Sequence, residues 1–122
     1  GAEEATEDRR EARADADDLQ GTAACGGSIT ARATVLTDVA ESGRLQAGDV
    51  LVTKQTDPGW APVFFVVGGL VMERGGVLSH GAIVARECGI PTVVGVAEAT
   101  RKIRTGQRVT VDGDAGYVQV LD

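Results

Sequence analysis

Short apolar segments separated by turn residues run along the chain from about Leu19 to its end. Segments that alternate, or that are apolar throughout, predict strands with one or both faces buried. Segments with a period of three to four residues predict helices. Strands are predicted over residues 31–39, 49–53, 70–73, 92–96, 107–111 and 117–121, and helices over residues 61–67, 79–88 and 97–104. The segment 61–67 also fits a strand. This interleaving predicts a mixed α/β domain.

Local signals mark where several of these elements begin and end. Asp57 followed by Pro58 is typical of a helix start, with Asp57 as the N-cap and Pro58 in the first turn. Gly89 predicts the end of helix 79–88, because glycine readily adopts the left-handed conformation that closes a helix. Residues 112–116 predict the turn of a terminal β-hairpin. Residues 21–30 are small and turn-prone.

The N-terminal segment differs in composition from the rest of the chain. Residues 1–18 contain acidic residues, arginines and alanines, without any large apolar side chain. Such a segment has no apolar face to dock, so a solvated helix and a disordered segment are both open. We predict a charged linker or disordered tail over residues 1–18 and one globular domain over residues 19–122.

Composition and charge narrow the class of protein. Only 3% of the 122 residues are aromatic, so the core must consist of aliphatic side chains. The net charge of −6 argues against nucleic-acid binding, which requires a basic face. The chain has neither an apolar run long enough to span a membrane nor an apolar signal segment, and we expect a cytoplasmic protein. With one histidine and two distant cysteines, Cys25 and Cys88, we expect no metal site and two buried, reduced thiols.

The single histidine carries the most specific chemistry in the chain. His80 follows the turn residues Gly75 and Gly76, then Ser79, and it opens the helix predicted over 79–88. Backbone N–H groups are unpaired at a helix start and favour an anion such as phosphate. The positive end of the helix favours the neutral, nucleophilic ring, and Ser79 or the loop N–H groups can bind phosphate oxygens. The sequence therefore predicts that His80 accepts a phosphoryl group.

The means of binding a nucleotide are not evident in the sequence. The chain contains neither a G-x-x-x-x-G-K-[ST] loop nor a G-x-G-x-x-G motif after a strand. No acidic cluster suited to Mg²⁺ is apparent after residue 18. Glu87 shares the helix stripe of His80 but lies about 10 Å along the axis, too far to act as its base. A histidine that can be phosphorylated, without a nucleotide site, indicates a phosphoryl carrier.

Residues 75–95 resemble the phosphohistidine signature of the PEP-utilising enzymes. This family includes phosphoenolpyruvate synthase, pyruvate phosphate dikinase, enzyme I of the sugar phosphotransferase system and antibiotic kinases of the rifampicin phosphotransferase type. The resemblance extends over about residues 20–122 and includes the segments 56–60 and 106–113. The segment 56–60 and the terminal hairpin are most similar to the antibiotic kinases.

The resemblance implies a swivelling β/β/α phosphohistidine domain. Such a domain moves between an ATP-grasp nucleotide-binding domain and an acceptor domain. His80 would take the β-phosphoryl group of ATP and pass it to pyruvate or to an antibiotic hydroxyl. ATP and magnesium would bind on the partner domain, so this domain would hold no cofactor and would not turn over alone.

The residues around His80 would support the phosphoryl group or the motif itself. These residues are Gly75, Gly76, Ser79, Gly81 and Arg86. Ser79 and Gly81 stand where many members have threonine and alanine. Residues 24–27, Ala-Cys-Gly-Gly, replace the more usual Ser-Pro-Gly.

Two other functions remain open from the sequence. The domain could belong to a natural-product ligase that activates its substrate through phosphohistidine. It could also be a stand-alone, non-catalytic interaction module of the same fold. An upstream ATP-grasp domain would indicate the enzyme, and a free-standing reading frame would indicate the module.

Overall fold

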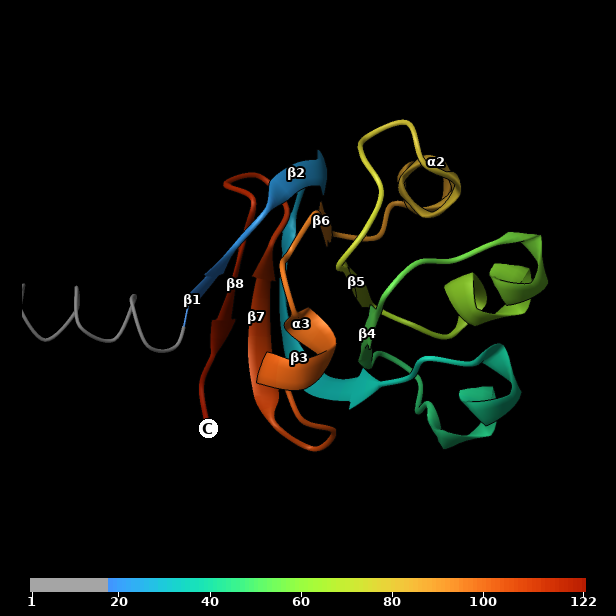
Figure 1. The fold of residues 1–122 in the computed structure, drawn as a ribbon, viewed down its shortest axis with the longest axis horizontal. Coiled ribbons are helices and arrows are strands. Elements are labelled where there is room, and N and C mark those ends of the chain that lie inside the picture. The colour runs from blue at the N-terminus through green and yellow to red at the C-terminus, as the bar shows by residue number, and fades with distance from the viewer. Residues whose placement is uncertain (1–17) are drawn as a thin grey trace, which may run out of the picture.

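The computed structural model describes residues 18–122 as a mixed α/β domain, which confirms the predicted fold class (Figure 1). The predicted tail lies outside the described residues except for Asp18, which begins the first strand. The strands are β1 (Asp18–Gln20), β2 (Thr22–Cys25), β3 (Ser28–Val35), β4 (Val50–Thr53), β5 (Gly69–Met72), β6 (Thr92–Val94), β7 (Arg108–Asp112) and β8 (Tyr117–Val120). The helices are the 3₁₀-helices η1 (Val39–Arg44) and η2 (Pro58–Phe65) and the α-helices α2 (His80–Cys88) and α3 (Ala99–Lys102).

The eight strands form one sheet in the order β1-β8-β7-β3-β4-β5-β6-β2. The four neighbouring strands from β3 to β6 run parallel to one another, and every other pairing is antiparallel. The connections between these parallel strands carry η1, η2 and α2, which lie along the same side of the sheet in Figure 1. Connections of one handedness that advance in one direction must lie on one face. The carboxyl ends of β4 and β5 therefore meet at the edge where α2 begins.

The sheet curls over itself and creates a second layer of strands. β5 and β6 both contact β7, although these strands are not neighbours in the sheet. Inside the curl lies one aliphatic core, to which Val52, Val93 and Val111 belong. On the outer face, η1, η2 and α2 cover a second core around Leu51 and Trp60. This arrangement of two strand layers and one helical layer agrees with the β/β/α architecture that the resemblance implies.

One buried carboxylate ties the start of β4 to β3. Asp49 Oδ2 accepts hydrogen bonds from Thr34 Oγ1 (2.7 Å), the Gln46 backbone N–H (2.9 Å) and Arg32 Nη2 (3.1 Å). Burial alone would raise the pKa of Asp49. The three donors outweigh burial and hold its pKa below the ordinary value, because they stabilise the charged form. The ionised carboxylate is thus part of the folded structure.

Two expectations for the chain before β4 are wrong. The segment expected as strand 31–39 is a strand over Ser28–Val35, because Asp38 accepts from the Ala40 N–H and starts η1. The turn-prone stretch 21–30 holds β2 and the first residues of β3. The small residues in this stretch allow it to pack closely against β6. For example, a Cβ on Gly21 would lie only 2.5 Å from the Val94 carbonyl oxygen.

The helix expectations are partly confirmed. Asp57 caps η2 by accepting from the Gly59 N–H at 2.8 Å, and Gly89 closes α2 in the left-handed region. Pro62 lies inside η2, which is a 3₁₀-helix. A proline at this position cannot donate the backbone hydrogen bond that an α-helix requires. The helix expected over 97–104 is reduced to the four residues of α3, which follows Glu98 at a positive φ of 57°.

The cysteine expectation is wrong in its placement. Cys25 is half-buried at the end of β2, and Cys88 is exposed in the last turn of α2. Both are free thiols in the structure.

Among residues 18–122, no helix is long and apolar enough to cross a membrane, and no group of His, Cys, Asp and Glu is arranged to hold a metal ion.

Candidate functional site

His80 is the first residue of α2, at the carboxyl edge of the parallel strands. Ligands of parallel α/β sheets bind at this edge, outside the strand ends. Ser79 precedes the helix in an extended conformation, and its hydroxyl donates to the Gly76 carbonyl oxygen at 2.7 Å. Gly75 has a φ of +91°, which favours glycine. These three residues therefore shape the loop that delivers His80 to the helix start.

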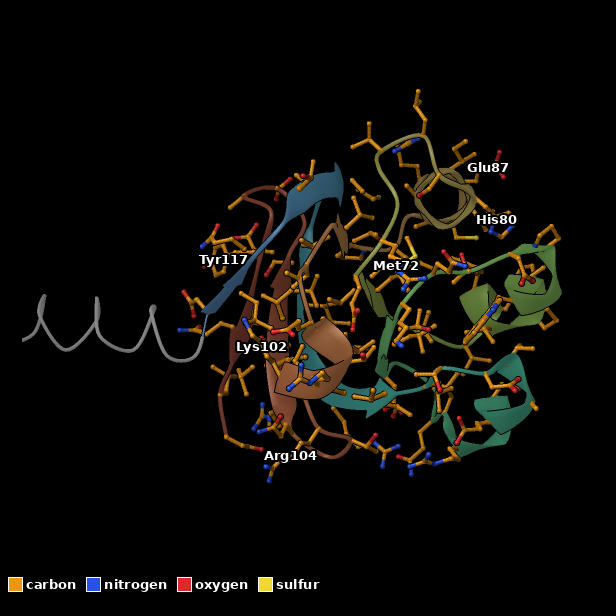
Figure 2. All side chains as sticks on the ribbon, in the orientation of Figure 1. Met72, His80, Glu87, Lys102, Arg104 and Tyr117 are labelled. Carbon is orange, nitrogen blue, oxygen red and sulfur yellow. The ribbon has the colours of Figure 1, made fainter. Side chains whose placement is uncertain are left out.

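Two side chains hold the imidazole ring of His80. Its Nδ1 atom lies 3.2 Å from Thr56 Oγ1, which comes from the connection after β4. Its ring meets the ring of Phe64 edge to face, with centroids 6.2 Å apart and an interplanar angle of 78°. Phe64 is itself buried in the core under the helices. The ring is thus half-buried and fixed on two sides (Figure 2).

The Thr56 hydroxyl lies between two possible partners, His80 Nδ1 at 3.2 Å and Met72 Sδ at 4.0 Å. In the tautomer with the proton on Nδ1, the Thr56 oxygen accepts from His80 Nδ1–H and its own proton points to the weak acceptor Sδ. That tautomer leaves an unshared electron pair on Nε2. Nε2 is the nucleophilic atom in this arrangement.

Gly81 lets the first turn of α2 approach these residues closely. A Cβ at Gly81 would lie 2.6 Å from Thr56 Oγ1 and 2.7 Å from Met72 Sδ. Figure 2 shows Met72 beneath α2 and His80 between α2 and η2. A side chain at Gly81 must displace the Met72 terminus or the Thr56 hydroxyl, so glycine preserves the contact between Thr56 and His80.

The remaining predicted site residues lie in different surroundings. Gly76 has open space around the position of a Cβ, and its contribution is the carbonyl oxygen that binds Ser79. Arg86 lies toward the other end of α2 and donates from Nη1 to the Ala24 carbonyl oxygen at 3.1 Å. This bond fastens α2 to β2. The structure thus brings Gly75, Ser79 and Gly81 together around His80, and Arg86 supports the motif through its bond to β2.

The sequence analysis missed the roles of Thr56 and Phe64. Both lie in the connection from β4 to β5, and the segment 56–60 was noted only as part of a resemblance. A usable signal exists for Thr56. It immediately precedes the Asp57-Pro58 helix start, close after a buried strand that neighbours the strand leading to His80. No comparable signal separates Phe64 from an ordinary core aromatic.

Residues 45–116 match the sequence model of the family described as PEP-utilising enzyme, mobile domain. The chain belongs to this family. The matched range contains His80 and every residue found around it, from Thr56 to Arg86. The predicted family resemblance is confirmed.

Relatives of this mobile domain are found in larger enzymes. The chain is 55% identical over 95 residues to rifampicin phosphotransferase from Streptomyces sviceus, a match that covers 78% of this chain and 11% of that protein. It is 51% identical over 92 residues to phosphoenolpyruvate synthase from Aquifex aeolicus, covering 73% of this chain and 11% of that protein. The chain thus spans about a tenth of the length of these relatives.

A solved structure agrees with the same assignment. The NMR solution structure of the Enzyme I (nEIt) protein is 33% identical to this chain and superposes with a TM-score of 0.57. The superposition covers 66% of this chain and 33% of that chain. The same fold therefore forms part of that solved chain.

Proposed function

We propose that this mobile domain is the phosphoryl carrier of a multidomain, ATP-dependent, dikinase-type phosphotransferase, with His80 as the acceptor. The contact between Thr56 Oγ1 and His80 Nδ1 is the observation that carries the proposal. It fixes the ring and leaves the Nε2 electron pair available for attack on phosphorus. Membership in the PEP-utilising family supports the same chemistry.

In this proposal His80 Nε2 forms a bond to the β-phosphorus of ATP as the bond between that phosphorus and the α-phosphate oxygen breaks, and AMP leaves. Water then cleaves the bond between the β- and γ-phosphoryl groups, so that ATP and one water yield the phosphohistidine, AMP and inorganic phosphate overall. As Nε2 bonds to phosphorus, the ring gains positive charge, and the Nδ1–H bond to Thr56 strengthens because its donor is now charged. Thr56 is therefore a positioning residue that also stabilises the phosphorylated ring.

The geometry at the start of α2 supports a role for its backbone in binding the phosphoryl oxygens. The first intrahelical bond in this turn runs from the Ile83 N–H to the Ser79 carbonyl oxygen. The N–H groups of residues 80–82 precede that bond and lie at the positive end of a nine-residue helix. Such groups favour an anion. Ser79 already donates to Gly76, so backbone groups rather than its hydroxyl are the donors in this proposal.

ATP and Mg²⁺ bind on a separate ATP-grasp domain in this proposal, and the acceptor binds on another. The relatives are named for rifampicin and for phosphoenolpyruvate, so an antibiotic hydroxyl and pyruvate are the two acceptor classes. The domain swivels between the donor and acceptor sites, in the cytoplasm where ATP is supplied.

The test is phosphate incorporation from ATP labelled at the β-position, using the full multidomain polypeptide. We expect acid-labile, base-stable label on the wild-type protein and none on His80→Asn. Label that persists on His80→Asn would refute the proposal. Release of the label to rifampicin or to pyruvate then distinguishes the two acceptor classes.

A further inference from the structure

The segment over residues 73–79 leads from β5 to His80, and we call it the His80 loop. Its start is bonded to the connection that follows β4, because the Arg74 N–H donates to the Lys54 carbonyl oxygen at 2.9 Å. Thr56, which contacts His80 Nδ1, lies two residues after Lys54. The start of the His80 loop therefore joins the two segments that carry the imidazole and its hydrogen-bond partner.

The side chain of Glu73 ties the start of the His80 loop to α3. Glu73 Oε2 accepts from the Thr100 N–H at 2.8 Å and also from the Thr100 hydroxyl. Glu98, the N-cap residue of α3, makes no side-chain bond to the helix start, and its carboxylate pairs with Arg101 at 2.7 Å. A carboxylate distant in the chain thus satisfies an N–H group that the first turn of α3 leaves unpaired.

The contact between Glu73 and Thr100 is made by an ionised carboxylate. Burial alone would raise the pKa of Glu73. The two bonds from Thr100 and the positive charges of Lys54 and Arg74 outweigh burial and hold this pKa below the ordinary value. Hydrogen bonds to a charged acceptor are stronger than those to a neutral one, so this contact is a firm attachment.

The other end of the His80 loop is closed on itself. The Gly76 carbonyl oxygen accepts from the Ser79 N–H at 3.1 Å and from the Ser79 hydroxyl at 2.7 Å. A Cβ on Gly75 would lie 2.9 Å from Ser79 Oγ, so the turn is tight. Little freedom remains between the start of the loop and His80, and a shift at Glu73 is passed on to the imidazole.

We propose that Glu73, through its contact with Thr100, is a positioning residue that sets the orientation of the His80 ring for phosphoryl transfer. This inference rests on the proposed function. Loss of the contact frees the start of the His80 loop from α3, and the ring then spends less time with Nδ1 against Thr56. A displacement of about 1 Å in a reacting group can cost about 10²-fold in rate, so a contact remote from the ring can control phosphorylation.

The experiment measures the initial rate of phosphohistidine formation in the full multidomain polypeptide. The donors are ATP and, separately, phosphoramidate, which diffuses to His80 without a docked domain. Glu73→Ala removes both bonds to Thr100, Thr100→Val removes only the hydroxyl bond, and Thr100→Ser retains both. The ¹⁵N chemical shifts of the His80 ring, assigned by comparison with His80→Asn, report its hydrogen bond to Thr56.

Asp112→Ala is the matched control. Asp112 is also a half-buried carboxylate, and its Oδ1 accepts from the N–H groups of Asp114 and Ala115 at 3.0 and 2.9 Å. These bonds lie in the turn between β7 and β8. The control therefore loses two hydrogen bonds and one charge without touching the His80 loop.

We expect Glu73→Ala to slow phosphorylation about tenfold or more with both donors, because the change lies in the nucleophile and not in the donor. Thr100→Val should slow it less, and Thr100→Ser should match the wild type. The His80 ¹⁵N shifts should move in Glu73→Ala. Asp112→Ala should keep the wild-type rates and shifts, which a general loss of stability in Glu73→Ala would not explain.

An unchanged rate or unchanged His80 ¹⁵N shifts in Glu73→Ala would overturn the inference. Slowing with ATP alone would overturn it as well, because Glu73 would then act on the donor and not on the ring. If Glu73→Ala does not fold, Thr100→Val keeps the carboxylate and decides the same question by the same two measurements. If wild-type His80 accepts phosphate from neither donor, the proposed function fails, and the ¹⁵N shifts still test whether Glu73 orients the ring.

Discussion

His80 Nδ1 lies 3.2 Å from Thr56 Oγ1, across two connections of the parallel sheet. The two residues are 24 positions apart in the chain. Thr56 follows β4 and His80 follows β5, and these strands are parallel neighbours, so both residues emerge at the same edge. The contact therefore depends on the register of the strands as much as on the residues themselves.

Replacing Thr56 by valine keeps the shape of the side chain but removes the acceptor for Nδ1–H. We expect phosphorylation of His80 to slow by about tenfold or more, the effect of losing one hydrogen bond of about 1.4 kcal/mol. The ¹⁵N chemical shifts of His80 should show a larger fraction of the Nε2–H tautomer. Thr56→Ser retains the hydroxyl and should restore both properties. Unaltered shifts in Thr56→Val would contradict the tautomer with the proton on Nδ1.

Arg86 fastens α2 to β2 through the Ala24 carbonyl oxygen. Arg86→Ala should lower the free energy of unfolding by about 1–2 kcal/mol, the range for a hydrogen bond from a charged donor at a half-open site. The rate of His80 phosphorylation by phosphoramidate should stay at the wild-type value. Urea denaturation and the phosphoramidate assay check the two parts. A large loss of phosphorylation without loss of stability would show that Arg86 contacts the phosphoryl group.

The carboxylate of Asp49 should make stability depend on pH. Its pKa is lowered in the fold, so its contribution is complete above the ordinary aspartate pKa and is lost as the pH falls through the folded value. Asp49→Asn should cost about 1–3 kcal/mol at pH 7. The difference from the wild type should shrink below about pH 4. Urea denaturation at several pH values measures it. If the difference in unfolding free energy between the wild type and Asp49→Asn stayed the same at every pH, the charge of Asp49 would not be the cause of that difference.

Glu87→Gln serves as the control for this measurement. Glu87 is an exposed carboxylate on α2, so the exchange removes the same charge without a buried hydrogen-bond network. Its effect should stay within about 0.5 kcal/mol at every pH tested.

Gly113 stands where the turn between β7 and β8 meets the connection from β2 to β3. A Cβ there would lie 1.9 Å from the Cys25 carbonyl oxygen, and the Gly113 N–H donates to the Gly27 carbonyl oxygen at 2.8 Å. Gly113→Ala forces one backbone segment to move and should cost about 3 kcal/mol or more. Gly43→Ala, with open space around its Cβ, should be neutral or slightly stabilising. Equal midpoints of thermal unfolding for the two variants would contradict this geometry.

The sequence predicts elements that depend on local chemistry. Asp57 starts η2 and Gly89 ends α2 because a cap and a left-handed glycine act within a few residues. The alternation of residues 107–121 predicts the terminal hairpin for the same reason. The position of His80 at a helix start follows from its glycine-rich approach and the helical run after it. The family resemblance around His80 needed no tertiary information.

The rest depends on contacts between distant segments. β2 consists of small residues and forms a strand because it pairs with β6. The adjacent Gly21 packs so closely against β6 that a larger side chain would not fit there. The curl of the sheet follows from which strands pair, and apolar alternation does not encode the pairing partner. The roles of Thr56 and Phe64 arise only when β4 and β5 align. The bond from Arg86 to the Ala24 carbonyl oxygen likewise joins segments that are distant in the chain.

Thr56 and Phe64, the two residues that contact the imidazole, both lie in the segment 56–80, which ends at His80. His80 and the two side chains that contact it therefore belong to one continuous segment of this domain. In the proposed carrier, a rotation of the domain would move all three together and keep the orientation of the ring. The same segment would also serve beside different acceptor domains without a change in its own contacts.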